Sequence, residues 1–254
     1  HKIASHSYWS DYVTAEGEDR LGYLRELLWE NLQETDPAAR YWVTEYCILG
    51  NAGDLVGNGR DLSIKPALMV ARTIHYDLTK ANASAWQWWT AVSKEDYKDG
   101  LLYTDYQLPG DEETIYESKL LWGFGNYSKF IRPGAVRIDL RGLAEHDPYG
   151  LMGSAYVHEE NQTITNVYVN YSQRAIDVII HPANLPAGYR VGLLTPYMTS
   201  ETEDLSEQPA IVPDSNGTFT YTLPAQSIVT LHGDIHPADG DMQVQGLMAA
   251  KSTK

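Results

Sequence analysis

Apolar and polar positions in the first half of the chain alternate between two periods. Short runs rich in β-branched and aromatic residues are separated by longer runs whose apolar side chains recur at helical spacing. These runs predict, in chain order, a strand over residues 2–6, a helix over 18–34, a strand ending at Glu45, a helix over about 63–80, a strand over about 84–89 and a helix over about 114–128. Strands separated by helices favour parallel β/α units.

The period changes to two after Arg132-Pro133-Gly134. Four later runs alternate in the manner of strands: 164–170, 175–180, 218–223 and 227–231. Short strands separated by Pro, Gly and Asn turns predict an all-β sandwich over residues 132–236. The tail over 237–254 has weak periodicity, which is typical of a partly disordered segment.

Three β/α units cannot close a sheet into a barrel, which needs about eight strands. Residues 1–131 therefore form either a small open sheet or the C-terminal part of a larger (β/α)8 barrel. The first six residues carry neither the basic nor the apolar segment of a signal peptide, and we interpret them as a strand already under way. We accordingly expect the natural chain to begin further upstream.

The formal net charge of −15 and the sequence pI of about 4.8 restrict the partners that the chain can attract. Phosphate backbones and anionic lipid surfaces are bound through Lys and Arg, so a nucleic-acid partner is not expected. Solubility is the simplest explanation of the acidity. No apolar run is long enough to span a bilayer, so we expect no membrane insertion.

The single cysteine, Cys47, excludes an intrachain disulfide and any metal site built from several cysteines. We interpret it as a small buried side chain, with a nucleophilic thiol as the alternative. The histidines beyond residue 6 show no ligand spacing typical of zinc, and we expect neither a metal nor an organic cofactor.

Candidate chemistry lies at the ends of two predicted strands. Glu45 follows the aromatic and β-branched run 41–44, and the next strand carries three tryptophans in the run 86–89. Aromatic rings stack on the apolar faces of pyranose rings, and a positioned carboxylate can attack or stabilise an oxocarbenium-like centre. The combination indicates sugar chemistry.

Five motifs occur in order along the chain: His6-Ser7-Tyr8-Trp9, Thr44-Glu45-Tyr46-Cys47, Ala85-Trp86-Gln87-Trp88-Trp89, Gly125-Asn126-Tyr127-Ser128-Lys129-Phe130-Ile131-Arg132-Pro133-Gly134 and Pro224-Ala225-Gln226-Ser227-Ile228. Together they resemble glycoside hydrolase family 30, and the resemblance extends to about residue 233. It implies a partial (β/α)8 TIM barrel, beginning at barrel strand six, followed by a β-sandwich side domain. It also implies hydrolysis of β-glycosidic bonds with retention of configuration.

The resemblance also implies roles for single residues. Glu45 matches the catalytic nucleophile of the family, and Tyr8 matches the tyrosine whose hydroxyl orients that carboxylate. His6 shares the inward face of Tyr8 by alternation. A core tyrosine and a structural histidine are the alternatives for Tyr8 and His6.

Substrate binding is expected on the tryptophan strand. Trp89 matches the tryptophan of the substrate subsite, Gln87 shares its strand face, and Trp88 is the second candidate for stacking on sugar. Any of these tryptophans, Trp86 included, can instead fill the space between sheet and helix. The Gly- and Asn-rich run 50–59 is interpreted as a substrate-facing loop.

One part of the family pattern is absent from this sequence. The family's general acid/base is a glutamate on barrel strand four, and retaining hydrolysis needs two carboxyl groups about 5–5.5 Å apart. Asp11, Asp54 and Asp61 are loop residues for which solvation or turn formation is the better interpretation. We therefore expect the isolated 254-residue chain to be inactive and the full-length parent to be an enzyme.

The expected partner is a β-linked polysaccharide or oligosaccharide, and the motifs look most like those of β-1,6-galactanase-like members of the family. β-1,6-Glucan and xylan stay open as substrates. A non-catalytic carbohydrate-binding module and a mere folding fragment are the alternatives to an enzyme. Polysaccharide degradation implies an extracellular or periplasmic location, and the oligomeric state stays open.

Overall fold

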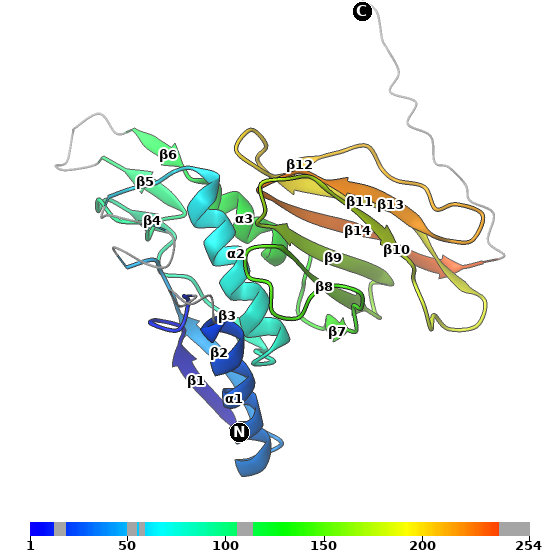
Figure 1. Ribbon diagram of the computed structural model, residues 1–254, viewed down its shortest axis with the longest axis horizontal. Coiled ribbons are helices and arrows are strands. Elements are labelled where there is room, and N and C mark those ends of the chain that lie inside the picture. The colour runs from blue at the N-terminus through cyan, green and yellow to red at the C-terminus, as the bar shows by residue number, and fades with distance from the viewer. Residues whose placement is uncertain (13–18, 50–54, 56–58, 106–113, 239–254) are drawn as a thin grey trace, which may run out of the picture.

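The computed structural model describes residues 1–12, 19–49, 55, 59–105 and 114–238, and Figure 1 shows its elements. In chain order they are β1 (Lys2–His6), α1 (Arg20–Thr35), β2 (Arg40–Glu45), α2 (Ile64–Thr79), β3 (Ala85–Trp86), β4 (Val92–Ser93), β5 (Leu102–Thr104), β6 (Ile115–Glu117), α3 (Lys119–Ser128), β7 (Val136–Ile138), β8 (Leu151–His158), β9 (Thr163–Asn170), β10 (Ile176–Ile180), β11 (Tyr189–Thr199), β12 (Ser206–Glu207), β13 (Phe219–Leu223) and β14 (Ser227–Pro237).

The first three strands form a parallel sheet in the order β1-β2-β3, with α1 and α2 as the connections. Tyr41 and Val43 of β2 are buried in a core cluster that includes Leu32 of α1 and Ala81 after α2. One face of the sheet is thus covered by helices, and the predicted parallel β/α units are confirmed. These are the units from which a (β/α)8 barrel is built.

Side-chain hydrogen bonds satisfy free amide donors at the starts of the two long helices, α1 and α2. The Asp19 side chain accepts a hydrogen bond from the Gly22 amide at the start of α1, which satisfies one of the free donors there. At α2 the Ser63 side chain accepts from Lys65, and a Glu201 oxygen lies 3.0 Å from the Ile64 amide nitrogen. The carboxylate of Glu201 comes from the sandwich, so a distant segment completes this helix terminus.

The sandwich consists of a six-stranded antiparallel sheet, in the order β12-β11-β14-β9-β8-β7, and a separate pair, β10-β13. Alternation along β9 places Tyr168 in the core shared with β10 and β13, and Val167 and Val169 in the core shared with α2. β9 is therefore buried on both faces. The fold class expected from sequence, a partial barrel followed by a β-sandwich, is confirmed.

Helices α2 and α3 lie between the parallel sheet β1-β2-β3 and the β-sandwich (Figure 1). Nearly every residue of α2 is buried, as expected for a helix covered on all sides. A Cβ atom at Gly123 of α3 would come within 2.9 Å of Ile228 and 3.1 Å of Ala67, so glycine allows this close approach. The main core joins both halves of the chain, and the division into domains 1–131 and 132–236 stays a prediction.

A buried arginine crosses the junction between α2 and the sandwich. The Arg72 guanidinium lies 5.3 Å from the ring centre of Tyr149 and 4.7 Å from that of Tyr171. Cation–π contacts of this kind are stronger where water is excluded, and Arg72 is fully buried. The junction is therefore built from polar as well as apolar contacts.

Two predicted elements differ from the structure. The strand expected over 84–89 is limited to Ala85–Trp86, because its regular pairing with β2 stops at Val43, two residues before the end of β2. The helix expected over 114–128 begins at Lys119, because Ile115–Glu117 pair with β5 as strand β6 and Ser118 keeps an extended backbone. The predicted loop over 50–59 and the tail over 237–254 lie largely outside the described residues.

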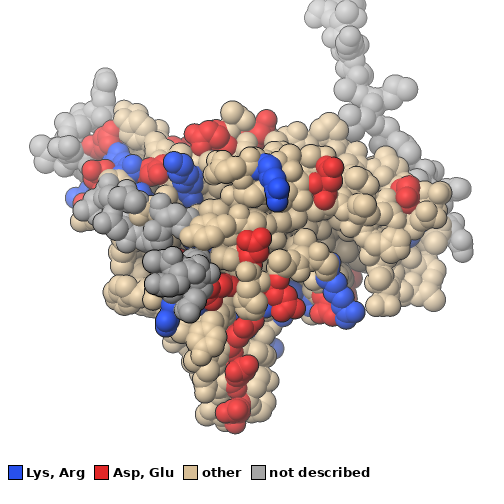
Figure 2. All heavy atoms as spheres, in the orientation of Figure 1, with Lys and Arg blue, Asp and Glu red and all other residues tan. Residues whose placement is uncertain are grey.

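On the face shown in Figure 2, acidic side chains are scattered among uncharged ones, and several form a row along the protrusion where α1 lies. Glu26, Glu30 and Glu34 are spaced four residues apart on that helix and so share one face. Such a face is well hydrated, which agrees with solubility as the explanation of the charge. No helix in the described part of the chain is long and apolar enough to cross a bilayer.

His75 of α2 predicts a loss of stability in acid. Burial, together with the nearby cations Lys80 and Arg137, lowers the pKa of its imidazole from 6.5 to about 3. Above pH 6.5 the imidazole is neutral in both the folded and the unfolded chain. Between pH 6.5 and about 3 it takes up a proton in the unfolded chain but stays neutral in the folded one. We expect this group to remove about 1.4 kcal/mol of folding free energy per pH unit between pH 6.5 and about 3.

Urea unfolding at pH 7 and at pH 4.5 measures this contribution. We expect His75→Phe to reduce the stability lost between these two pH values by about 2–3 kcal/mol relative to the unsubstituted protein. The exposed His181 is the matched control, and His181→Gln should leave the pH dependence unchanged. Equal pH dependence in all three proteins would contradict the assignment.

Candidate active site

A pocket of about 440 Å³ lies where β1, β2 and β3 end. Its lining residues come from the ends of these strands and the segments that follow them: His6, Tyr8, Trp9, Glu45, Cys47, Leu49 and Trp89. The carboxyl ends of parallel barrel strands are the edge on which active sites are built. The pocket therefore occupies the position expected of a catalytic or binding site.

An irregularity in the sheet directs Glu45 into the pocket. Ser5 pairs with Val43, but the next residue, His6, pairs with Glu45, so β2 contains one extra residue, Thr44. In a strand without this irregularity, simple alternation would turn Glu45 toward the helices with Tyr41 and Val43. The bulge instead places the carboxylate beside His6, with 3.8 Å between Glu45 Oε1 and His6 Nδ1.

Tyr8 forms the closest polar contact of this carboxylate. Its phenolic hydroxyl donates to Glu45 Oε1 at 3.0 Å and lies 3.5 Å from Cys47 Sγ. Burial, followed by the neighbouring Cys47 and Glu45, raises the pKa of the Tyr8 phenol far above its usual value. The phenol therefore keeps its proton and acts as a hydrogen-bond donor to the carboxylate.

Cys47 lies in the pocket wall but is not activated. Its side chain is buried, and burial is the main cause that raises the pKa of the thiol. A nucleophilic cysteine needs a lowered pKa and a cationic neighbour. The structure thus favours the small buried side chain expected from the sequence.

The tryptophan segment divides between pocket and core. Trp89 lines the pocket with 55% of its surface exposed. Trp88 packs against the core, its indole N–H donates to the Asp99 carbonyl at 2.8 Å, and its ring stacks with Trp86. Gln87 is exposed and does not line the pocket. Of the expected site residues, His6, Tyr8, Glu45 and Trp89 thus come together, whereas Trp88 and Gln87 lie elsewhere.

Trp9 and Leu49 line the pocket although the sequence did not single them out. Trp9 follows Tyr8 directly, yet adjacent residues of an extended strand point to opposite faces. A turn at residues 8–9 removes that alternation and brings both rings to one pocket. No periodic signal in the sequence marks such a turn.

The other candidate carboxylates among the described residues, Asp11 and Asp61, are not part of the pocket lining. Asp11 was expected to be solvated, but it is buried and accepts a hydrogen bond from the Tyr46 hydroxyl at 2.5 Å. Asp61 accepts from the Ser63 amide at 3.0 Å, as a turn residue does, and Asp54 lies outside the described residues. Among the described residues, Glu45 is the carboxylate that lines the pocket.

No group of three His, Cys, Asp or Glu side chains in the described ranges is arranged to hold a metal ion. The pocket itself offers one carboxylate and one imidazole, from Glu45 and His6, set among aromatic and apolar side chains. Such a lining suits an uncharged ligand that presents both hydroxyl groups and apolar C–H faces.

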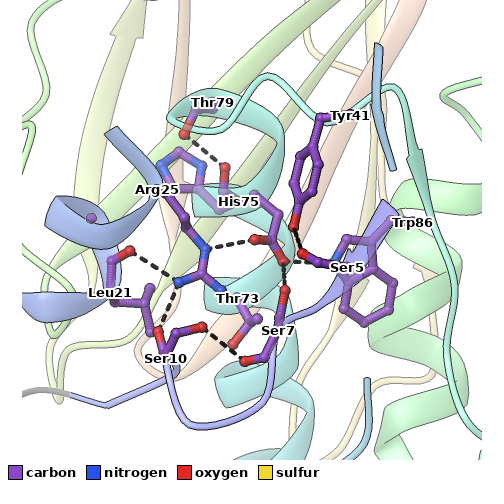
Figure 3. A network of polar contacts seen from close by, with 12 residues as sticks. Ser5, Ser7, Ser10, Leu21, Arg25, Tyr41, Thr73, His75, Thr79 and Trp86 are labelled. Atoms are coloured by element: carbon purple, nitrogen blue, oxygen red, sulfur yellow. Dashed lines mark hydrogen bonds and ion pairs between the residues drawn. The ribbon is translucent and has the colours of Figure 1, made fainter. Parts of the chain in front are cut away.

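A buried polar network anchors the turn that carries Tyr8 and Trp9 (Figure 3). The Asp77 carboxylate of α2 accepts from Arg25 Nε at 2.6 Å, from Ser7 Oγ at 2.9 Å and from Trp86 Nε1 at 2.8 Å. Arg25 Nη1 also donates to the Ser10 carbonyl at 2.7 Å. The two ends of the turn are thus bound to one ion pair, which also connects α1, α2 and β3.

Comparison with known proteins identifies the first part of the chain. The sequence model of O-glycosyl hydrolase family 30 matches residues 1–103, which contain every residue of the pocket. This part of the chain is thus similar to glycoside hydrolase family 30. The similarity agrees with the resemblance found in the five sequence motifs.

Solved structures extend the comparison to the whole chain. A conserved exported protein from Bacteroides fragilis matches with 28% identity and a TM-score of 0.72, over 91% of this chain and 45% of its own length. A family 30 endoxylanase from Clostridium papyrosolvens (20% identity, TM-score 0.63) and a family 30 xylanase from Clostridium acetobutylicum (22% identity, TM-score 0.62) match 92% and 91% of this chain. Each is matched over 48% of its own length.

This chain therefore spans a little under half the length of these structures. The similarity to the two xylanases concerns the fold, which in this chain consists of parallel β/α units followed by a β-sandwich. The pocket described above lies within the matched part.

The Arg25–Asp77 pair predicts a large effect on stability. Both side chains are buried, so Asp77→Ala would leave the Arg25 charge without its partner and would also free Ser7 and Trp86. We expect a loss of about 3–5 kcal/mol in the free energy of unfolding, measured by urea denaturation.

The exposed ion pair of Arg141 and Asp139 is the control for this experiment. Its Arg141 Nη2 atom lies 3.0 Å from Asp139 Oδ2. Arg141→Ala should change the stability by less than about 1 kcal/mol, because exposed ion pairs are screened by water. Equal effects of Asp77→Ala and Arg141→Ala would show that the buried network does not stabilise the fold.

Proposed function

We propose that this chain is the C-terminal part of a retaining β-glycoside hydrolase that acts on a polysaccharide, with Glu45 as the nucleophile. The observation that carries the proposal is the 3.0 Å hydrogen bond from the Tyr8 hydroxyl to Glu45, inside a pocket that also contains Trp89. A nucleophilic carboxylate must be aimed at the reacting carbon, and a protonated phenol at this distance holds its oxygen in one position.

The chemistry follows in two steps. A Glu45 oxygen forms a bond to the anomeric carbon while the bond from that carbon to the leaving oxygen breaks, and a second carboxyl group protonates the leaving oxygen. Water then releases the sugar from Glu45, and the second carboxyl group takes up the proton of that water. Tyr8 holds the free Glu45 in position before the first step and after the second.

The second carboxyl group sets the requirement for activity. Among the described residues of the pocket, Glu45 is the carboxylate present, and hydrolysis with retention needs a partner about 5–5.5 Å away. We expect the partner to come from a part of the barrel that precedes residue 1. The 254-residue chain alone is accordingly expected to be inactive.

β-1,6-Galactan is the substrate that the sequence motifs favour, with β-1,6-glucan and xylan as the alternatives. Xylan gains weight because two of the structures that share this fold are xylanases. Such polymers occur outside the cytoplasm, so we propose an extracellular or periplasmic enzyme that requires no metal or organic cofactor for this chemistry.

Release of reducing sugar tests the proposal directly. The 254-residue chain and a version extended at its N-terminus to a complete barrel are incubated with the three polysaccharides, each beside its Glu45→Gln variant. We expect release by the extended protein alone and a loss of at least about 1000-fold in Glu45→Gln, which cannot form the covalent intermediate. Activity in the short chain would refute the need for a missing carboxyl group.

Tyr8→Phe tests the orienting hydrogen bond. A hydrogen bond to a charged group contributes about 1.5–3 kcal/mol, so we expect kcat of the extended protein to fall about 10- to 100-fold with a smaller change in KM. Tyr23 on α1 is an exposed tyrosine away from the pocket, and Tyr23→Phe is the control. A Tyr8→Phe variant with unchanged kcat would remove Tyr8 from the mechanism.

A carbohydrate-binding module is the second candidate function. The single carboxylate in the described pocket and the exposed ring of Trp89 favour it, since stacking alone supports binding without hydrolysis. This candidate requires that glycan binding be weakened in Trp89→Ala and unchanged in Glu45→Ala, and that the extended protein release no sugar.

A further inference from the structure

Trp9 is an aromatic side chain that is largely exposed to solvent. It lines the pocket, yet 81% of its surface is exposed, so its indole contributes little to the core. Its ring touches Tyr8 at a centroid distance of 5.9 Å in a tilted arrangement. A single exposed apolar side chain is ordinary on a protein surface, but this one lines the pocket that contains Glu45 and Trp89.

The backbone of Trp9 is also strained. Its φ angle is 58°, in the left-handed region that bulky residues rarely adopt. Glycine would occupy this position without strain. Strained residues persist only where their surroundings hold them, and they gather at functional sites.

The surroundings that hold this turn are those described above. Ser10 Oγ donates to the Ser7 carbonyl at 3.0 Å and closes the turn around Tyr8 and Trp9. Ser7 is in turn bound to Asp77, and Ser10 to Arg25 (Figure 3). A rigid turn therefore presents a large exposed ring at the mouth of the pocket.

Sheet order decides on which side of Glu45 this ring lies. Trp9 follows β1, Glu45 ends β2 and Trp89 follows β3, and these strands are neighbours in that order. Adjacent strands are about 4.8 Å apart, so the starting points of the two tryptophan segments are about 10 Å apart, on either side of β2. The two tryptophan segments thus leave the sheet on opposite sides of the strand that ends at Glu45.

Resting on the proposed function, we propose that Trp9 is a substrate-binding residue that stacks on a second sugar ring of the glycan, across Glu45 from the ring bound by Trp89. The ligand class is a β-linked oligosaccharide of at least two residues that crosses the pocket from the β1 side to the β3 side. Such an arrangement suits cleavage within a polymer, because the chain is held on both sides of the reacting carboxylate.

The test uses the protein extended to a complete barrel, with the polysaccharide that it hydrolyses as the probe. We expect Trp9→Ala to raise KM about 3- to 10-fold with a smaller change in kcat, as for the loss of one stacking contact. Trp9→Tyr should restore most of the affinity, because it keeps an aromatic face. Tyr23→Ala, which removes an exposed ring from α1, should leave KM unchanged.

Two further measurements separate binding from a structural role. Trp9→Gly should weaken binding as much as Trp9→Ala without lowering the melting temperature, because glycine relieves the strain and little apolar surface is lost. In the double variant Trp9→Ala/Trp89→Ala, the two fold-changes in KM should multiply, as expected for contacts with separate sugar rings.

The outcomes distinguish this inference from the function on which it rests. Hydrolysis by the unsubstituted protein with an unchanged KM in Trp9→Ala would refute the role of Trp9 and leave the proposed function intact. A lower melting temperature in Trp9→Gly, or fold-changes that do not multiply, would likewise refute it. If the unsubstituted protein hydrolyses no glycan, the proposed function fails, and the role of Trp9 fails with it.

Discussion

The buried ion pair of Arg25 and Asp77 is the interaction on which the candidate site depends. Burying two charges is costly unless they are paired and further hydrogen-bonded, and here Ser7, Trp86 and the Ser10 carbonyl add hydrogen bonds to the pair. These partners lie on segments far apart in the sequence. One interaction thus fixes the relative positions of two helices, the end of β3 and the turn that carries Tyr8 and Trp9.

A second constraint arises from α2, which packs against two sheets at once. One side of this helix covers β2, and another packs with α3 on β8, β9 and β14 of the sandwich. The helix is buried along almost its whole length, and Glu201 of the sandwich binds the Ile64 amide at its start. The sandwich therefore supports the helix whose Asp77 anchors the site, even though it contributes no side chain to the pocket itself.

The bulge at Thr44 shows how a small irregularity creates a site. A regular β2 would direct Glu45 toward the helices, where an unpaired carboxylate would be unfavourable. The extra residue turns the carboxylate to the open edge, next to His6 and under the Tyr8 hydroxyl. Backbone pairing and site chemistry are consequently linked at this one position, as is common for bulges near active sites.

The meeting of Tyr8, Glu45, His6 and Trp89 at one edge was expected from the ordered motifs of a family resemblance, but local patterns were sufficient for the parallel β/α units and the later sandwich. Strand alternation, helical spacing and chain order carry this information, because each depends only on neighbouring residues. The burial of Asp11, the packing of Trp88 in the core and the pairing of Ile115–Glu117 as a strand were not predictable in this way. Each of these depends on contacts between segments distant in sequence. The same holds for Trp9, whose place in the pocket results from a strained turn bound to Arg25 and Asp77. Those hydrogen bonds join segments far apart in the sequence, so the periodicity of the chain does not predict them.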